Sequence, residues 1–109
     1  MLWKFSEFNC GDFIVPAKNP TMVIILRDNK CFDLHYVVRL SGMLQTRKDI
    51  CENEFPPNYA KDVDFRHATP FEVQFTLQTL LQKGLYWDFV RNCAIPVDDL
   101  RKLFFSSKM

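Results

Sequence analysis

The sequence predicts an α+β fold. We expect an N-terminal curled antiparallel sheet of about four strands, SH3-like, packed with a capped central helix, a short hairpin and a short C-terminal helix. Short apolar runs separated by turn residues occupy residues 1–48, loop-like sequence occupies 49–65, and helix start and stop signals lie within 66–109. The 109 residues suffice for one domain with a real core but not for two, so a single domain is expected.

Four strands are expected in the first half. Gly11-Asp12 is a turn that leads into a short strand, which ends at Pro16 because proline cannot donate to a strand ladder. Residues 21–27 form an apolar, β-branched run that suits a buried strand. Residues 31–40 form a third strand after a tight turn, and residues 43–48 form a fourth.

The third of these strands alternates between two kinds of side chain, which is typical of a half-buried strand. The alternation places two sets of residues on opposite faces. The first set is Phe32, Leu34, Tyr36, Val38 and Leu40. The second set is Asp33, His35, Val37 and Arg39.

Residues 49–65 change in character and predict a loop. This stretch contains Pro56-Pro57 and interspersed acidic residues. Its aromatic residues, Phe55, Tyr59 and Phe65, are expected to hold the loop against the core.

The central helix is expected over residues 70–83, because the sequence encodes both of its ends. Thr69 and Glu72 form a capping box around Pro70, the first helical position. Gly84 takes the left-handed conformation that ends a helix. The apolar stripe expected to face the core consists of Val73, Leu77, Leu80 and Leu81, broadened by Phe71 and Phe75, with Gln74, Gln78 and Gln82 opposite.

The remaining residues predict a hairpin and a last helix. Residues 85–90 and 93–95 are short strands about the turn-compatible pair Arg91-Asn92. Pro96 either ends the second strand or opens the short helix that is expected to follow. Its acidic start and basic end suit the helix dipole. Its expected buried face consists of Leu100, Leu103 and Phe104.

The composition argues against several classes of function. Fourteen basic and thirteen acidic residues give a net charge of +1, which is not the charge of a strongly basic nucleic-acid binder. No apolar run is long enough to cross a bilayer, and the N-terminus lacks the pattern of a signal peptide. We therefore expect a cytoplasmic protein without a membrane partner.

The chain also predicts neither a metal site nor a cofactor. Cys10, Cys31, Cys51 and Cys93 form no closely spaced pair, and mostly buried free thiols are expected in a reducing compartment. Two disulfides remain the alternative if the protein is exported. The three glycines cannot form a phosphate-binding loop. An enzyme that uses a cysteine with His67 or His35 is the third and last hypothesis for function, and no catalytic residue is predicted.

A basic sheet face is the alternative functional site. Arg39, Arg47 and Lys48 are close in the expected sheet, and small barrels bind single strands through basic grooves. Acidic residues follow directly in the sequence and dilute this patch. Nucleic-acid binding is therefore the second hypothesis.

Several signals recur in a familiar order. They are Trp3, Gly11-Asp12-Phe13, Arg66, Ala68-Thr69-Pro70, Glu72, Leu80, Gly84 and Trp87-Asp88. This order resembles a group of small uncharacterised accessory proteins of bacteriophages and prophages of gut bacteria. The chain departs from that pattern at Val73-Gln74, where a charged pair is usual, and in its last helix. The resemblance implies a mobile-element origin and an accessory role in a bacterial host, and it supplies no catalytic residue.

The first hypothesis for function is a non-enzymatic protein-interaction module. Sixteen aromatic residues can fill the core of a small domain and still leave a contact patch. The expected partner is a host or phage protein. An anti-defence inhibitor and a virion accessory protein both fit.

Overall fold

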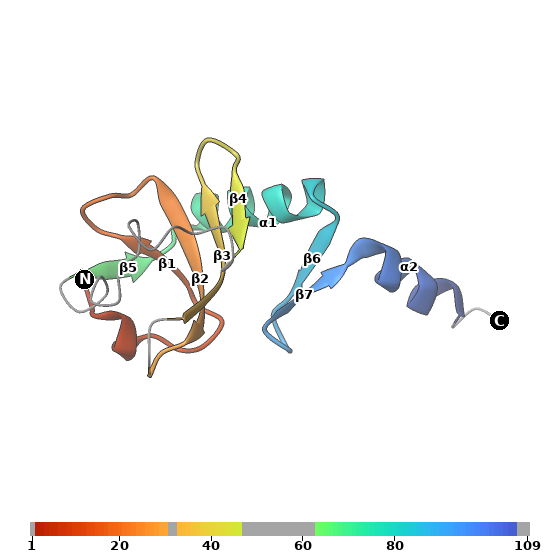
Figure 1. Cartoon of the computed structure of the whole chain (residues 1–109), viewed down its shortest axis with the longest axis horizontal. Coiled ribbons are helices and arrows are strands. Elements are labelled where there is room, and N and C mark those ends of the chain that lie inside the picture. The colour runs from red at the N-terminus through yellow and green to blue at the C-terminus, as the bar shows by residue number, and fades with distance from the viewer. Residues whose placement is uncertain (1, 31–32, 47–62, 107–109) are drawn as a thin grey trace.

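The described residues form seven strands, two α-helices and one 3-10 helix (Figure 1). The computed structural model describes residues 2–30, 33–46 and 63–106, with the backbone alone for 103–106. In chain order the elements are η1 (Phe5–Glu7), β1 (Phe13–Pro16), β2 (Met22–Asp28), β3 (Asp33–Arg39), β4 (Leu44–Thr46), β5 (Phe65–His67), α1 (Pro70–Gln82), β6 (Leu85–Asp88), β7 (Cys93–Pro96) and α2 (Val97–Ser106). The predicted α+β class is confirmed.

Five antiparallel strands form the main sheet, in the order β4-β3-β2-β1-β5, and β6 and β7 form a separate hairpin. The described sheet is open, with β4 and β5 at its edges, so an SH3-like closure stays a prediction. The predicted strands of the first half, the hairpin and both helices are present.

The fifth strand corrects the predicted loop. Phe65, which was assigned to the loop, begins β5 and is fully buried. This strand pairs with β1, where His67 lies opposite Ile14. Three residues are too few to show a strand period, and the pairing partner lies some fifty residues earlier, so no local signal predicts this strand. Phe55 and Tyr59 lie outside the described residues.

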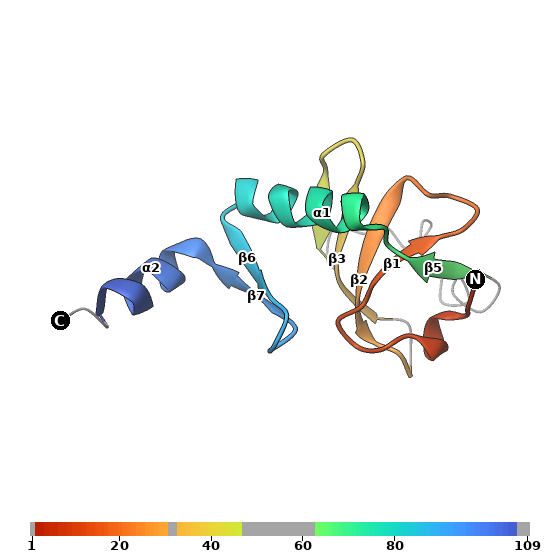
Figure 2. The ribbon, with the colours of Figure 1, turned by 180° about the vertical axis from the view of Figure 1, so that it is seen from behind.

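Both faces of the sheet are covered, which explains the unbroken apolar run of β2. On one face, Ile24 and Leu26 pack with Phe8 of the N-terminal segment. On the other face, Val23 and Ile25 pack beneath α1 and the hairpin. Figure 2 shows α1 lying across this second face. A strand buried on both sides needs apolar residues at every position rather than at every second one.

A bulge in β3 corrects the predicted alternation. Ile25 pairs with Tyr36, but the next residue of β2, Leu26, pairs with Leu34, so His35 is an extra residue without a partner across the ladder. An extra residue reverses the faces of the residues beyond it. Leu34 therefore packs with Val37 in the core of the N-terminal face, whereas the prediction put these two side chains on opposite faces.

The capping box that starts α1 is confirmed, and it is tied to the sheet. The Glu72 N–H donates to the Thr69 hydroxyl at 3.2 Å, and the Thr69 N–H donates to the Glu72 carboxylate at 2.8 Å. Arg66 of β5 donates to both oxygens of the same carboxylate, at 2.7 and 3.0 Å. Arg66 lies opposite Val15 and so extends from the face that α1 covers. One carboxylate thus joins the edge strand to the helix.

The buried face of α1 differs from the predicted stripe. Its buried residues are Glu72, Thr76, Thr79 and Leu80. Polar residues are tolerated there because each threonine hydroxyl donates to a carbonyl oxygen one turn earlier, at 2.7 and 2.9 Å. The prediction was wrong for Phe71 and Leu81, whose exposed fractions are 73% and 52%. The three glutamines are exposed, as predicted.

Two glycines help to position the hairpin, Gly84 at its start and Gly11 beside its turn. Gly84, at φ +78°, ends α1 as predicted, and its N–H donates to the Leu81 carbonyl at 2.9 Å. The hairpin turn then contacts the loop before β1, where the Asn92 amide donates to the Cys10 carbonyl at 3.4 Å. Gly11 allows this approach because a Cβ there would overlap the Asn92 carboxamide. The hairpin is therefore held at its turn as well as at its base.

The Glu72 carboxylate is expected to make the fold sensitive to acid. Hydrogen bonds from Arg66 hold its pKa below the ordinary value of 4.5, although burial opposes this. A carboxyl whose pKa is lower in the folded chain stabilises the fold above its unfolded pKa, and this stability is lost as the pH falls through the folded pKa. Glu72→Gln should cost about 1–3 kcal/mol at pH 7 and make stability less pH-dependent below about 4.5. Urea unfolding from pH 2 to pH 7 measures both effects.

Glu7→Gln is the matched control for this prediction. Glu7 also accepts a backbone N–H three residues earlier, from Lys4, but it is exposed. Equal costs for the two substitutions would contradict the role assigned to Arg66.

The packing of Asn92 against Gly11 can be separated from backbone strain by two matched substitutions. Gly11 and Gly42 have nearly equal φ values, +92° and +95°, but no atom lies within 4 Å of a Cβ added at Gly42. Gly11→Ala should therefore destabilise the fold by about 1–3 kcal/mol more than Gly42→Ala, measured by urea unfolding. Asn92→Gly in the Gly11→Ala background should remove most of the difference. Equal effects at both glycines would show that the hairpin turn does not pack on Gly11.

Candidate functional site

An apolar groove runs between α1 and β6, with a volume of about 260 Å³. Gln74 and Gln78 form its polar rim. The apolar residues that line it are Leu77, Leu81, Tyr86, Trp87 and Phe89. We call this site the α1–β6 groove.

Large apolar side chains stay exposed around the α1–β6 groove. Leu81, Tyr86 and Phe89 have exposed fractions of 52%, 46% and 56%. The hairpin turn adds Val90, which is 92% exposed. Single exposed apolar residues are common on protein surfaces, whereas several gathered about a groove are typical of a binding surface.

Different contacts hold the two walls of the groove in place. One wall is α1, which Arg66 and Glu72 hold on the sheet. The other is β6, where Trp87 is only 2% exposed and lies edge-on to Phe13 of β1, with ring centroids 5.9 Å apart. Because side chains alternate along a strand, Tyr86 is directed away from the core that holds Trp87. The groove therefore has a buried floor and an exposed lip.

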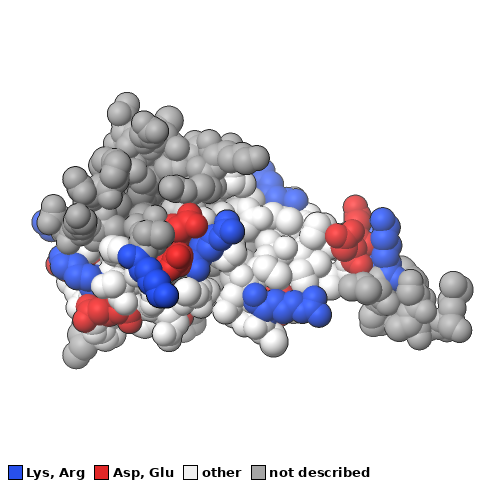
Figure 3. All heavy atoms as spheres, turned by 60° about the horizontal axis from the view of Figure 1, so that its bottom comes forward, with Lys and Arg blue, Asp and Glu red and all other residues white. Residues whose placement is uncertain are grey.

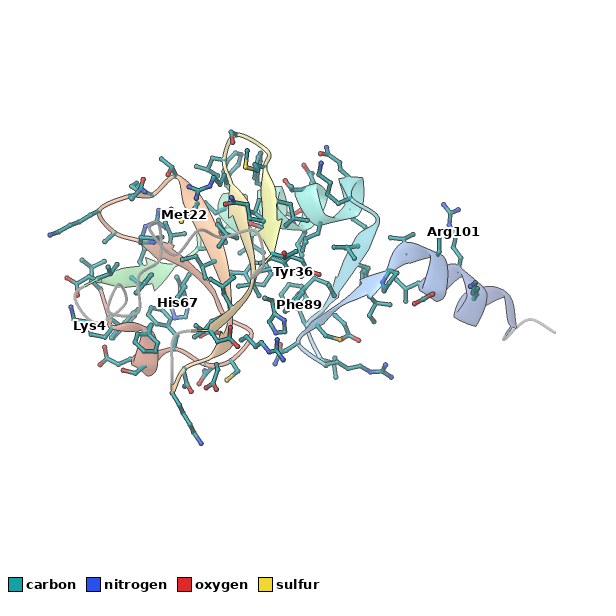
Figure 4. The ribbon with its side chains drawn as sticks, viewed as in Figure 1. Lys4, Met22, Tyr36, His67, Phe89 and Arg101 are labelled. Atoms are coloured by element: carbon teal, nitrogen blue, oxygen red, sulfur yellow. The ribbon has the colours of Figure 1, made fainter. Side chains whose placement is uncertain are left out.

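Phe89 lies at the lower end of the groove and also contacts the sheet. Its ring stacks on Phe13 with a centroid distance of 5.7 Å and an interplanar angle of 24°. Figure 4 shows Phe89 on the side of the hairpin that faces the sheet. Half of this side chain is nevertheless exposed. Phe89 thus links the groove to the domain core.

His35 lies beneath the hairpin because of the bulge in β3. Its ring is edge-on to Trp87, with ring centroids 5.2 Å apart. Burial lowers the pKa of His35 below 6.5, and the positive charge of Arg27 lowers it further, while Asp33 acts in the opposite direction. The Trp87 indole N–H is buried and makes no hydrogen bond to any described residue. This edge-to-face pair was not predicted, because it depends on a bulge that the sequence does not mark.

The predicted basic face lies only in part within the described residues. Arg39 lies at the end of β3, and its Nε donates to Gln45 at 2.9 Å. Arg47 and Lys48 lie outside the described residues. On the face shown in Figure 3, the described Lys and Arg side chains alternate with Asp and Glu. Nucleic-acid binding through these residues stays a prediction.

Cys10 and His67 line a second pocket, of about 340 Å³, beside the loop before β1. In the described parts of the chain no hydrogen bond joins the two side chains. The His67 ring packs instead edge-on to Trp3 and Phe8, at 5.5 and 4.9 Å (Figure 4). His67 therefore makes aromatic contacts with the N-terminal segment.

The described cysteines are free thiols, and their burial was mispredicted in part. Cys10 is exposed and Cys93 is half-buried. Cys31 and Cys51 lie outside the described residues. Among residues 2–30, 33–46 and 63–106, no three His, Cys, Asp or Glu side chains are placed to hold a metal ion together.

Comparison with known proteins gives no further assignment. None of the helices in the described part of the chain is both long and apolar enough to span a membrane. No family model, no curated protein and no solved structure matches this chain.

Acidification below about pH 6.5 is expected to loosen the hairpin. A histidine with a lowered pKa in the folded chain contributes stability above its unfolded pKa, and this stability is lost as the pH falls through the folded value. Protonation would place a positive charge in a partly buried site beside the Trp87 ring, where burial disfavours the charged form. Urea unfolding between pH 5 and pH 7 should therefore show a decline that His35→Gln removes and His67→Gln retains. A decline that survives His35→Gln would contradict this role of His35.

Proposed function

We propose that this protein is a non-enzymatic protein-interaction module and that the α1–β6 groove is its binding surface. One observation carries the proposal. Leu81, Tyr86 and Phe89 remain about half exposed around a groove whose floor is the buried Trp87. Burial of such side chains in an interface would gain about 25 cal/mol for each Å² of apolar surface removed from water.

The groove suits an amphipathic helical segment of a protein. Helices bind in grooves by inserting apolar residues spaced three and four apart, while their polar face stays in water. The rim offers the uncharged amides of Gln74 and Gln78, which can hydrogen-bond without the desolvation cost of a charge. An aromatic floor and lip are also typical of the well-packed centre of protein interfaces.

The proposal also covers the biological origin of the protein and the compartment in which it binds its partner. The resemblance in Arg66, the cap residues and Trp87-Asp88 supports a phage or prophage accessory protein that acts in the cytoplasm of a bacterial host. An anti-defence inhibitor or a virion accessory protein would use such a groove. The strand order β5-β1-β2-β3-β4 supports the SH3-like part of the fold prediction, because SH3-like sheets have this meander order.

Capture from host-cell lysate tests the proposal when it is done with matched variants. The wild-type chain should retain a stoichiometric protein that survives nuclease treatment. Leu81→Glu places a charge in the groove and should weaken that capture at least about tenfold, which corresponds to ~1.4 kcal/mol. The neighbouring Gln82→Glu adds the same charge on the exposed polar side of α1 and should leave capture unchanged. Quantitative mass spectrometry of the three eluates measures the difference.

Two results would reject the groove as the binding surface. The first is equal capture by Leu81→Glu and by wild type. The second is recovery of nucleic acid and its usual companions alone, lost after nuclease, which would favour the second hypothesis based on Arg39, Arg47 and Lys48.

A further inference from the structure

The chain carries an amphipathic helix, α2, whose backbone extends beyond the other described elements. In α2, Leu100 is half-buried, whereas Asp98, Asp99 and Arg101 are exposed. The sequence places Leu103 and Phe104 three and four residues after Leu100, which is the spacing of a single apolar stripe. The helix packs chiefly against β7 and extends beyond the sheet, α1 and the hairpin in both ribbon views (Figures 1 and 2).

The connection to β7 prevents α2 from covering the groove of its own copy. Pro96 pairs with Leu85 at the open end of the hairpin, and the Val97 N–H donates to the Gly84 carbonyl at 2.9 Å. These contacts fix the start of α2 beside the corner where α1 turns into β6. From that corner the helix runs away from the body, and Arg101 points into solvent (Figure 4). A reversal of α2 toward the groove would break the last hairpin pair and the Val97–Gly84 bond.

We propose that the α1–β6 groove binds α2 of a second copy, and that two copies exchange this helix reciprocally. The inference rests on the proposed function, because it names the partner of the same groove. Both halves of the contact belong to one hairpin unit, since β6 forms a wall of the groove and β7 leads into α2. A two-fold axis beside the hairpin would therefore satisfy both grooves and both helices at once.

The dimensions and the chemistry of the two surfaces agree. The groove follows α1 from Gln74 to Leu81, about 10 Å at 1.5 Å per residue, and the ten residues of α2 extend about 15 Å. The apolar stripe of α2 would face the apolar walls. Exposed Lys83 lies at the end of α1, and its charge is opposite to that of Asp98 and Asp99 in the first turn of α2. These features favour α2 over a segment with a basic first turn.

Light scattering coupled to size-exclusion chromatography tests the exchange on the full chain. The wild type should move from about 12.9 kDa toward twice that mass as its concentration rises from 1 to 500 μM. Leu81→Glu in the groove and Leu100→Glu in α2 should each shift the transition to at least about tenfold higher concentration. Gln82→Glu and Lys102→Glu alter exposed positions of the same two helices and should leave it in place. Far-ultraviolet circular dichroism confirms that each variant is folded.

Mixing the two impaired variants gives the sharper result. A mixed pair retains one intact contact, between α2 of the Leu81→Glu chain and the groove of the Leu100→Glu chain. Native mass spectrometry should therefore detect mixed dimer above the share that random pairing gives, which is twice the amount of each homodimer. A symmetric interface elsewhere would give only that random share, and this result would overturn the exchange. The mixed dimer needs only one intact groove and one intact helix. The measurement therefore works even if each substitution abolishes the contact in which it lies.

The outcomes separate this inference from the proposed function. A wild-type chain that stays monomeric at 500 μM overturns the exchange. If Leu81→Glu still loses a captured host or phage protein, the groove remains a protein-binding surface with a different ligand. A concentration-dependent dimer that only the groove and α2 substitutions weaken supports the exchange, even where no foreign protein is captured.

Discussion

The ion pair between Arg66 and Glu72 is the contact on which the arrangement of sheet and helix depends. Removing two charges from water is costly, and the pair is stable here because the carboxylate also accepts the Thr69 N–H and both of its oxygens are bound by the guanidinium. Arg66 belongs to the edge strand β5, so the pair joins that strand to the first turn of α1. It thereby fixes which side of the helix faces the sheet.

The exposed surface follows from this orientation. With Glu72 directed at the sheet, the residues one and two turns later on the same side are Thr76, Thr79 and Leu80, and these become the buried row. Leu81 and Phe71, which a purely apolar stripe would bury, are turned outward. The hairpin then covers the rest of the face with Trp87. The groove is the space left between a helix oriented by a salt bridge and a strand positioned by an aromatic ring.

Local signals allowed much of the fold to be predicted, and nonlocal contacts limited the rest. Thr69, Pro70, Glu72 and Gly84 define the ends of α1 within a few residues of sequence, so those boundaries were correct. The bulge at His35, the strand β5 and the orientation of α1 each depend on a partner far away in the chain. Of the candidate site, Trp87 is buried and Tyr86 is 46% exposed, although both follow the helix cap directly, and only the pairing of β6 decides which of the two faces the core. Arg66 and Glu72 both belong to the R-x-A-T-P-x-E motif. Their six-residue spacing does not by itself predict an ion pair, because the two side chains meet only when β5 and α1 lie side by side.

The two walls of the groove rest on different titratable groups. The β6 wall rests on Trp87 beside His35, whose pKa is lowered below 6.5, and the α1 wall rests on Glu72, whose pKa is lowered below 4.5. Protonation of His35 would loosen the hairpin, which carries α2, whereas protonation of Glu72 would weaken the hold of Arg66 on α1. A ligand that touches both walls would lose its contacts with Tyr86 and Phe89 through the first event and those with Leu77 and Leu81 through the second, because only Tyr86 and Phe89 move with the hairpin.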